Sequence, residues 1–99
     1  MNITKRRIDD CLTITLEGRL DTTNAHELED VLKTGLAGVT ELIFDLSGLE
    51  YMSSAGLRLM LSAQKTMNKQ GKMEIRNSTE LVKSVFAITG MDSVLNITD

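Results

Sequence analysis

The chain has 99 residues, 41% of them hydrophobic, which is enough for one small domain with a single core, expected over residues 1–99. The net charge of −3 at pH 7 argues against nucleic acid and against an anionic membrane surface as partners. Cys11 is the only cysteine, which excludes an internal disulfide, and no apolar stretch reaches membrane-spanning length, so we expect no membrane insertion and a cytoplasmic location.

The first two predicted elements are strands joined by a tight turn. Residues 3–8 predict a weak strand, residues 11–17 alternate cleanly, and Asp9-Asp10 fits the turn between them. One face of the second strand carries the apolar residues Leu12, Ile14 and Leu16. Gly18 is expected to end this unit. Cys11 lies in the alternating strand, where we expect a small buried side chain rather than a reactive thiol.

A helix and a central strand are expected next. Asn24 and Glu27 resemble a capping box at the start of the helix, and Gly35 or Gly38 offers its end. The apolar residues at helical spacing are Ala25, Leu28, Val31, Leu32 and Leu36. Residues 42–46 form a short apolar run without alternation, which indicates a central strand covered on both faces.

The rest of the chain predicts two more helices and up to two more strands. After a short loop over residues 47–52, we expect a helix over about residues 54–69 and a strand over residues 72–76. A third helix is expected over about residues 77–90, and residues 94–97 allow a last short strand. The order β-β-α-β-α-β-α predicts an α/β fold, with helices packed against a mixed sheet of four to five strands.

Residues suited to catalysis or metal binding are few. His26 is the only histidine, and no cysteine is spaced with it for a metal site, so we expect a solvated helix histidine, no metal and no cofactor. Ser53 and Ser54 lack the Gly-x-Ser-x-Gly elbow of a serine hydrolase, because Met52 stands where glycine would be needed. We therefore predict that the protein is not an enzyme.

The two adjacent serines stand where the second helix begins. One hydroxyl is enough to cap a helix, at about 1 kcal/mol relative to alanine, and Ser53 suits that role. The hydroxyl of Ser54 is then left over, beside unpaired backbone N–H groups and the positive end of the helix dipole. This is a favourable place to carry a phosphate.

The second helix is apolar around much of its circumference, which leaves two interpretations. The helix packs between the sheet and a neighbouring helix, or part of it lies at the edge of a protein-binding face. The second interpretation rests on Leu59, Met60 and Met67.

Four segments resemble the STAS domain family, the fold shared by bacterial anti-sigma factor antagonists and the cytoplasmic tails of sulfate transporters. They are Gly-Arg-Leu-Asp at 18–21, Asp-Leu-Ser-Gly-Leu-Glu-Tyr-Met at 45–52, Ser-Ala-Gly-Leu at 54–57 and Ile-Thr-Gly-Met at 88–91. The resemblance runs essentially end to end, and the length is that of a stand-alone antagonist.

The resemblance implies a mechanism called partner switching. The antagonist binds an anti-sigma factor that is also a serine kinase, which releases the sigma factor. The kinase then phosphorylates the antagonist, and a PP2C-type phosphatase resets the switch. The family's acceptor serine aligns with Ser54, and Ser53, which replaces the usual acidic residue before it, is the second candidate. The partner-binding residues that the resemblance implies are Asp21, Thr22, Ser53, Ser54, Ala55, Gly56, Leu57 and Arg58.

Two alternatives stay open at the level of sequence. A constitutive STAS subunit, for example of an ABC-type lipid transport complex, would use both serines only for structure. A small nucleotide- or anion-binding domain would use the same helix end for a free ligand.

Overall fold

The structure, a computed structural model, describes residues 1–98, which form five strands, three α-helices and one short 3-10 helix. In chain order these are β1 (Asn2–Ile8), β2 (Cys11–Leu20), α1 (Ala25–Gly35), β3 (Glu41–Met52), α2 (Ser54–Asn68), β4 (Lys72–Arg76), α3 (Glu80–Thr89), η1 (Met91–Ser93) and β5 (Ile97–Thr98). The predicted α/β class and element order are confirmed.

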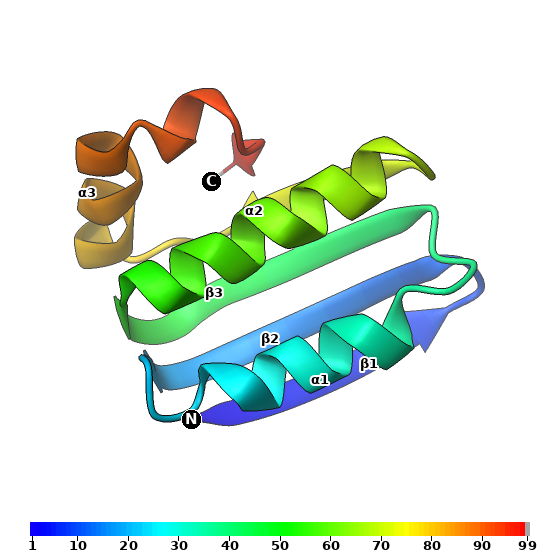
Figure 1. The fold of residues 1–99 in the computed structure, drawn as a ribbon, viewed down its shortest axis with the longest axis horizontal. Coiled ribbons are helices and arrows are strands. Elements are labelled where there is room, and N and C mark those ends of the chain that lie inside the picture. Colours follow the sequence, from blue (N-terminus) through cyan, green and yellow to red (C-terminus); the bar gives the residue numbers. More distant parts are fainter. Residues whose placement is uncertain (99) are drawn as a thin grey trace.

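The strands form one mixed sheet in the order β1-β2-β3-β4-β5. β1 and β2 pair antiparallel through a turn in which Asp9 has a φ of 53°, and the other neighbours pair parallel, each joined through a helical crossover. α1 and α2 lie side by side across one face of the sheet, and α3 packs beside β3 (Figure 1). The carboxyl ends of β2 and β3 therefore meet at one edge of the sheet, where α1 and α2 begin.

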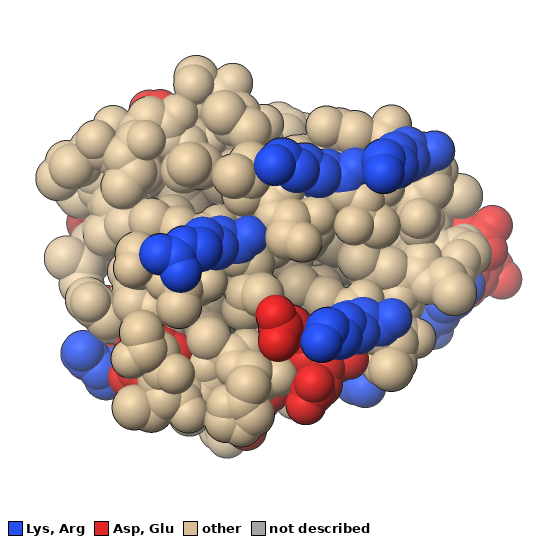
Figure 2. All heavy atoms as spheres, in the orientation of Figure 1, with Lys and Arg blue, Asp and Glu red and all other residues tan. Residues whose placement is uncertain are grey.

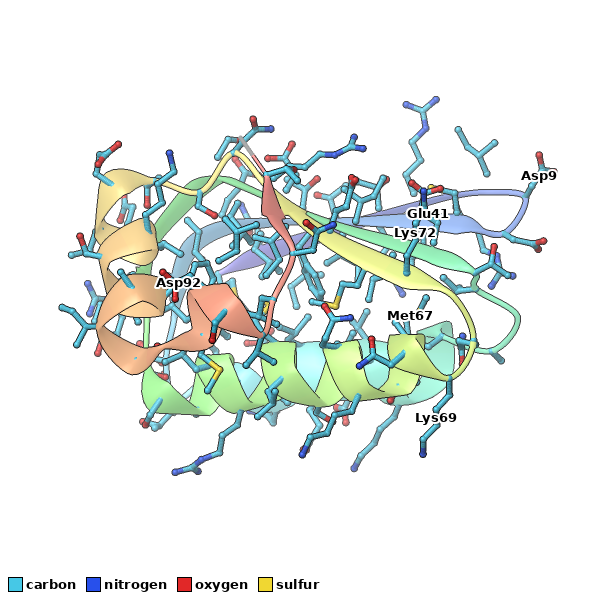
Figure 3. The ribbon with its side chains drawn as sticks, turned by 90° about the horizontal axis from the view of Figure 1, so that it is seen from above. Asp9, Glu41, Met67, Lys69, Lys72 and Asp92 are labelled. Atoms are coloured by element: carbon cyan, nitrogen blue, oxygen red, sulfur yellow. The ribbon has the colours of Figure 1, made fainter. Side chains whose placement is uncertain are left out.

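The core lies between the sheet and these two helices. Its buried members include Leu12, Ile14 and Leu16 of β2, as predicted, together with Leu42, Phe44 and Leu46 of β3, Leu28 of α1, and Met60, Ala63 and Met67 of α2. Figure 3 shows Met67 on the sheet side of α2 and Lys69 on the far side. Because Met60 and Met67 are fully buried, the first of the two interpretations is confirmed for this helix: it packs between the sheet and α1. Of the three residues named for a binding edge, only Leu59 is partly exposed.

No helix covers the opposite face of the sheet among the residues described (Figure 3). Ile43 faces this side and is 8% exposed, but its register neighbours are Thr13 and Glu74, so polar side chains shield it. The apolar run of β3 is thus buried on both faces, as predicted, but on this side neighbouring side chains rather than a helix cover it. Cys11 is half-buried, which corrects the expectation of a buried thiol.

Two strands run further than the sequence predicts. β2 continues through Gly18 to Leu20, and β3 continues to Met52, so the expected loop over residues 47–52 is strand. Two register irregularities between β2 and β3, together with a φ of 96° at Gly18, mark β-bulges that let the pairing continue. A bulge breaks the alternation of side chains, and the sequence pattern therefore hides the continuation.

Several helix and strand ends also differ from prediction, whereas α2 and β4 match their expected ranges to within one residue. Asn24 precedes α1 but makes no side-chain capping hydrogen bond, so its capping box with Glu27 does not form. α3 begins at Glu80 because Asn77 takes a left-handed φ of 60°, which breaks the helix. β5 begins only at Ile97, because residues 94–96 form the turn that follows η1, in which the amides of Val94 and Leu95 donate to the Met91 carbonyl.

Candidate functional site

The candidate site lies where β2 and β3 end together. Leu20 and Met52 are paired in register, and the Ser53 amide donates a hydrogen bond of 2.9 Å to the Leu20 carbonyl. This bond joins the start of α2 to the end of β2. The turn that leads into α1 and the first turn of α2 are therefore parts of one surface.

Close packing fixes the first turn of α2 on these strand ends. A Cβ atom on Gly56 would lie 2.8 Å from Cγ of Leu20 and 2.9 Å from Cγ of Met52, and both side chains are buried. Gly56 and Leu57 are themselves buried. These two residues therefore lie beneath the surface and help to position it, and their expected contact with a partner stays a prediction.

Ser53 caps α2, as predicted. Its Oγ accepts a hydrogen bond from the Gly56 amide at 3.4 Å, and its carbonyl accepts one from the Leu57 amide at 3.0 Å. The backbone of Ser53 is extended, with φ −85° and ψ 174°, which is the usual conformation of a cap. The hydroxyl oxygen of Ser53 is thus already hydrogen-bonded within the domain.

Ser54 is the first residue of α2 and is exposed. Its hydroxyl makes no hydrogen bond within residues 1–98, and the first turn of α2 holds no acidic residue. Ala55 is half-buried and Arg58, one turn further on, is exposed. The free hydroxyl stands at the positive end of the helix dipole, a position that favours an added negative charge.

The turn between β2 and α1 is held by its own side chains. Asp21 Oδ1 accepts hydrogen bonds from the Thr23 hydroxyl at 2.6 Å and from the Thr23 amide at 3.0 Å, and these bonds lower the pKa of Asp21. Asn24 accepts from the Asp21 amide at 3.0 Å and donates to the Arg19 carbonyl at 2.8 Å. Thr22 is left exposed at the tip of the turn.

One contact beside the site was not predicted from the sequence. The guanidinium of Arg19 lies 4.3 Å from the centroid of the Tyr51 ring, a cation–π contact between residues paired in register. Their pairing depends on the β-bulges, so no pattern in the sequence could have brought them together.

A shallow groove runs between α1 and α2 on the outer face. Its end nearest the site has a volume of about 220 Å³ and is lined by His26, Arg58 and Leu59, among others. A larger part of about 440 Å³ follows, lined partly by Leu36 and Ala63. Lys and Arg side chains lie over α2 on this face, whereas acidic side chains gather over α1 beside a basic side chain (Figure 2). The last turn of α1 contains Lys33. The exposed His26 agrees with the expected solvated helix histidine.

Neither a cluster of metal ligands nor a membrane-spanning helix occurs within residues 1–98. No group of three or more His, Cys, Asp or Glu side chains in this part of the chain could hold a metal ion. The longest helix of the same residues is too short and too polar to cross a membrane.

Comparison with known proteins then decides the family. The model of the STAS domain matches residues 2–99. This chain belongs to the STAS domain family. BtrV of Bordetella bronchiseptica, named as a candidate anti-sigma factor antagonist, is 33% identical, over 98% of this STAS domain and 85% of BtrV.

Two solved structures show the same fold. An anti-sigma factor antagonist from Mycobacterium paratuberculosis superposes with a TM-score of 0.88 at 20% identity, covering 97% of this STAS domain and 83% of that chain. The phosphorylated form of SpoIIAA, a Bacillus cell fate determinant, gives a TM-score of 0.77 at 20% identity, covering 99% and 92%. The mixed sheet and its three helices are therefore those of the family.

Proposed function

We propose that this STAS domain is an anti-sigma factor antagonist controlled by phosphorylation of Ser54. In its unphosphorylated state it binds an anti-sigma factor that is also a serine kinase, which frees a sigma factor. The kinase then transfers the γ-phosphoryl group of ATP to the Ser54 hydroxyl, ADP leaves, and the complex separates. A PP2C-type phosphatase hydrolyses the phosphoserine and restores the binding form.

The observation that carries this proposal is the division of roles between two adjacent serines. Ser53 Oγ is hydrogen-bonded as the cap of α2, whereas the Ser54 hydroxyl is exposed and unpaired within residues 1–98. A kinase needs a hydroxyl that it can reach without unfolding the helix start. Ser54 offers one, and modification there leaves the cap in place.

The names of the relatives support the same role. BtrV carries the name of an anti-sigma factor antagonist and matches over nearly the whole of this chain. SpoIIAA is known in a phosphorylated form with the same fold. These names support an antagonist that accepts a phosphate.

Electrostatics explains how one phosphate could separate the complex without unfolding the domain. A phosphoserine adds about −1.5 to −2 charges near neutral pH, and the start of α2 accepts such a charge favourably. At a packed interface the same charge has to be desolvated, which costs several kcal/mol unless the partner supplies cations. The domain then stays folded while its affinity for the kinase falls.

The test first captures the partners of this protein from its native cells, and then uses the captured kinase, ATP and three forms of the chain. Phosphate should appear on Ser54 in the parent protein and in Ser53→Ala, and none should appear in Ser54→Ala. Peptide mapping by mass spectrometry reads the site directly. Phosphate on Ser53 alone would move the switch to that residue, and no phosphate on either serine would contradict the proposal.

The same purification tests the alternative of a constitutive transport subunit. Recovery of a transporter ATPase with no kinase, unaffected by Ser54→Glu, would favour that alternative. We expect instead a kinase whose recovery is lost with Ser54→Glu.

A further inference from the structure

We propose that the guanidinium of Arg58 holds the phosphate of phosphorylated Ser54, so that one modification both adds negative charge and withdraws a cation from the partner-binding surface. This inference rests on the proposed phosphorylation of Ser54. It assigns a second residue to the switch and gives Arg58 a different role in each of its two states.

Helix geometry places the two side chains together. Ser54 and Arg58 belong to α2 and are separated by four residues, so their Cβ atoms lie about 5–6 Å apart on the same side of the helix. Both residues are exposed. The anion would stand on the N-terminal side of the cation, which is the favourable orientation for such a pair.

Nothing in the described structure already occupies Arg58. Its guanidinium makes no ion pair or hydrogen bond within residues 1–98, and α2 contains no acidic residue along its whole length. The next cation on the helix, Lys65, lies nearly two turns beyond Arg58. Arg58 is therefore the cation of α2 that a phosphate on Ser54 meets first.

The charged groups on neighbouring elements leave this pairing open. From α1, Glu29 and His26 line the same small groove as Arg58, and Glu29 lies 3.8 Å from its own partner Lys33. From the β2–α1 turn, the carboxylate of Asp21 is bonded to Thr23. Glu50, at the end of β3, and Glu80, at the start of α3, are both exposed to solvent.

Arginine suits this task better than lysine. Its planar guanidinium can donate two parallel hydrogen bonds to phosphate oxygens, whereas an ammonium acts as a single point charge. Before phosphorylation the same exposed guanidinium is free to meet a carboxylate of the kinase. After phosphorylation it is held within the domain, and the kinase loses that contact.

The test measures the second pKa of the phosphoserine, near 6, by phosphorus NMR. Phosphoserine is incorporated at position 54 during translation, so that no kinase is needed. With Arg58 present, we expect this pKa to lie about 0.2–0.4 unit lower than in Arg58→Gln, because the guanidinium favours the dianion. Arg58→Lys should restore part of the difference, and Lys65→Gln should leave the parent value unchanged.

An unchanged phosphoserine pKa in Arg58→Gln would overturn the inference. It would also be overturned if Lys65→Gln raised this pKa as much as Arg58→Gln does, because the pKa would then depend on the overall positive charge of α2 rather than on a specific pair. The outcome is separable from the proposed function. If the pKa responds to Arg58 but no kinase modifies Ser54, the proposed function fails alone. If a kinase modifies Ser54 but the phosphoserine pKa is the same with and without Arg58, only this inference fails.

Discussion

Two strand-to-helix junctions lie next to each other on this STAS domain, and they use their polar residues differently. At the β2–α1 junction, the side chains of Asp21 and Asn24 are both engaged in local hydrogen bonds, and Glu27 already supplies an acid to the first turn of α1. At the β3–α2 junction, only Ser53 is engaged. Ser54 is free, and the first turn of α2 contains no acidic residue.

The difference supports the proposal that the β3–α2 junction is the part that responds to phosphorylation. At the start of α1, an acidic residue already offsets the positive end of the helix dipole, and local hydrogen bonds already hold the side chains. A further negative charge there would therefore add little stabilisation. The start of α2 keeps its favourable field for an anion and has a cation, Arg58, one turn away. We therefore regard the β2–α1 junction as a fixed support and the β3–α2 junction as the part that changes state.

The largest effect on stability is expected at the packing that holds α2 in place. Gly56→Ala should destabilise the domain by about 2–3 kcal/mol, because the new Cβ would lie 2.8 Å from Cγ of the buried Leu20. Gly35→Ala is the matched control, since its Cβ would meet Leu12 Cδ2 at an ordinary 3.9 Å. Urea unfolding measures both, and equal effects would show that α2 does not rest tightly on the strand ends.

A smaller difference separates the two polar residues that precede the helices. Asn24→Ala should cost about 1.5 kcal/mol of unfolding free energy, because it removes two hydrogen bonds of 2.8 and 3.0 Å. Ser53→Ala should cost about 0.5–1 kcal/mol, because its one capping bond is long, at 3.4 Å. Thermal unfolding of the two variants gives the order. A larger destabilisation by Ser53→Ala than by Asn24→Ala would contradict the view that the β2–α1 junction is the more firmly held of the two.

The smallest expected effect is a pH dependence at Asp21. Its pKa is lowered in the folded state, chiefly by the hydrogen bond from the Thr23 hydroxyl, so its contribution to stability is present above the ordinary value of 3.8. That contribution is lost as the pH falls through the folded-state pKa. Asp21→Asn should therefore destabilise at neutral pH and converge on the parent protein in acid. Thr23→Val should weaken the same pH dependence. A loss of unfolding free energy in Asp21→Asn that is equal at neutral and at acidic pH would contradict this prediction.

Much of this arrangement could be predicted from local sequence patterns, and the exceptions have physical causes. Alternation identified the core face of β2, and the need for only one cap separated Ser53 from Ser54. The capping box at Asn24 did not form, because the Asn24 side chain instead bonds backbone atoms of Arg19 and Asp21. Those atoms lie in a segment whose strand continuation depends on a bulge, which the sequence pattern does not show.

The contact between Arg19 and Tyr51 could not be predicted for a related reason. It requires the register of two strands beyond the bulges, and register is a property of the assembled sheet. The exposure of Ser54, by contrast, follows from its position one residue past a cap and about 120° around the helix from the buried Met60. Sequence reasoning thus reached the exposed serine that is proposed as the switch, but not the hydrogen bonds and packing around it.

The most direct test of the central claim compares the affinity of the kinase for this domain with serine and with phosphoserine at position 54. We expect the phosphoserine form to bind at least about 30-fold more weakly, equivalent to about 2 kcal/mol, while its melting temperature is not lowered. Calorimetric titration and a thermal scan of the same samples give both values. Equal affinities, or weaker binding accompanied by unfolding of the domain, would contradict the account.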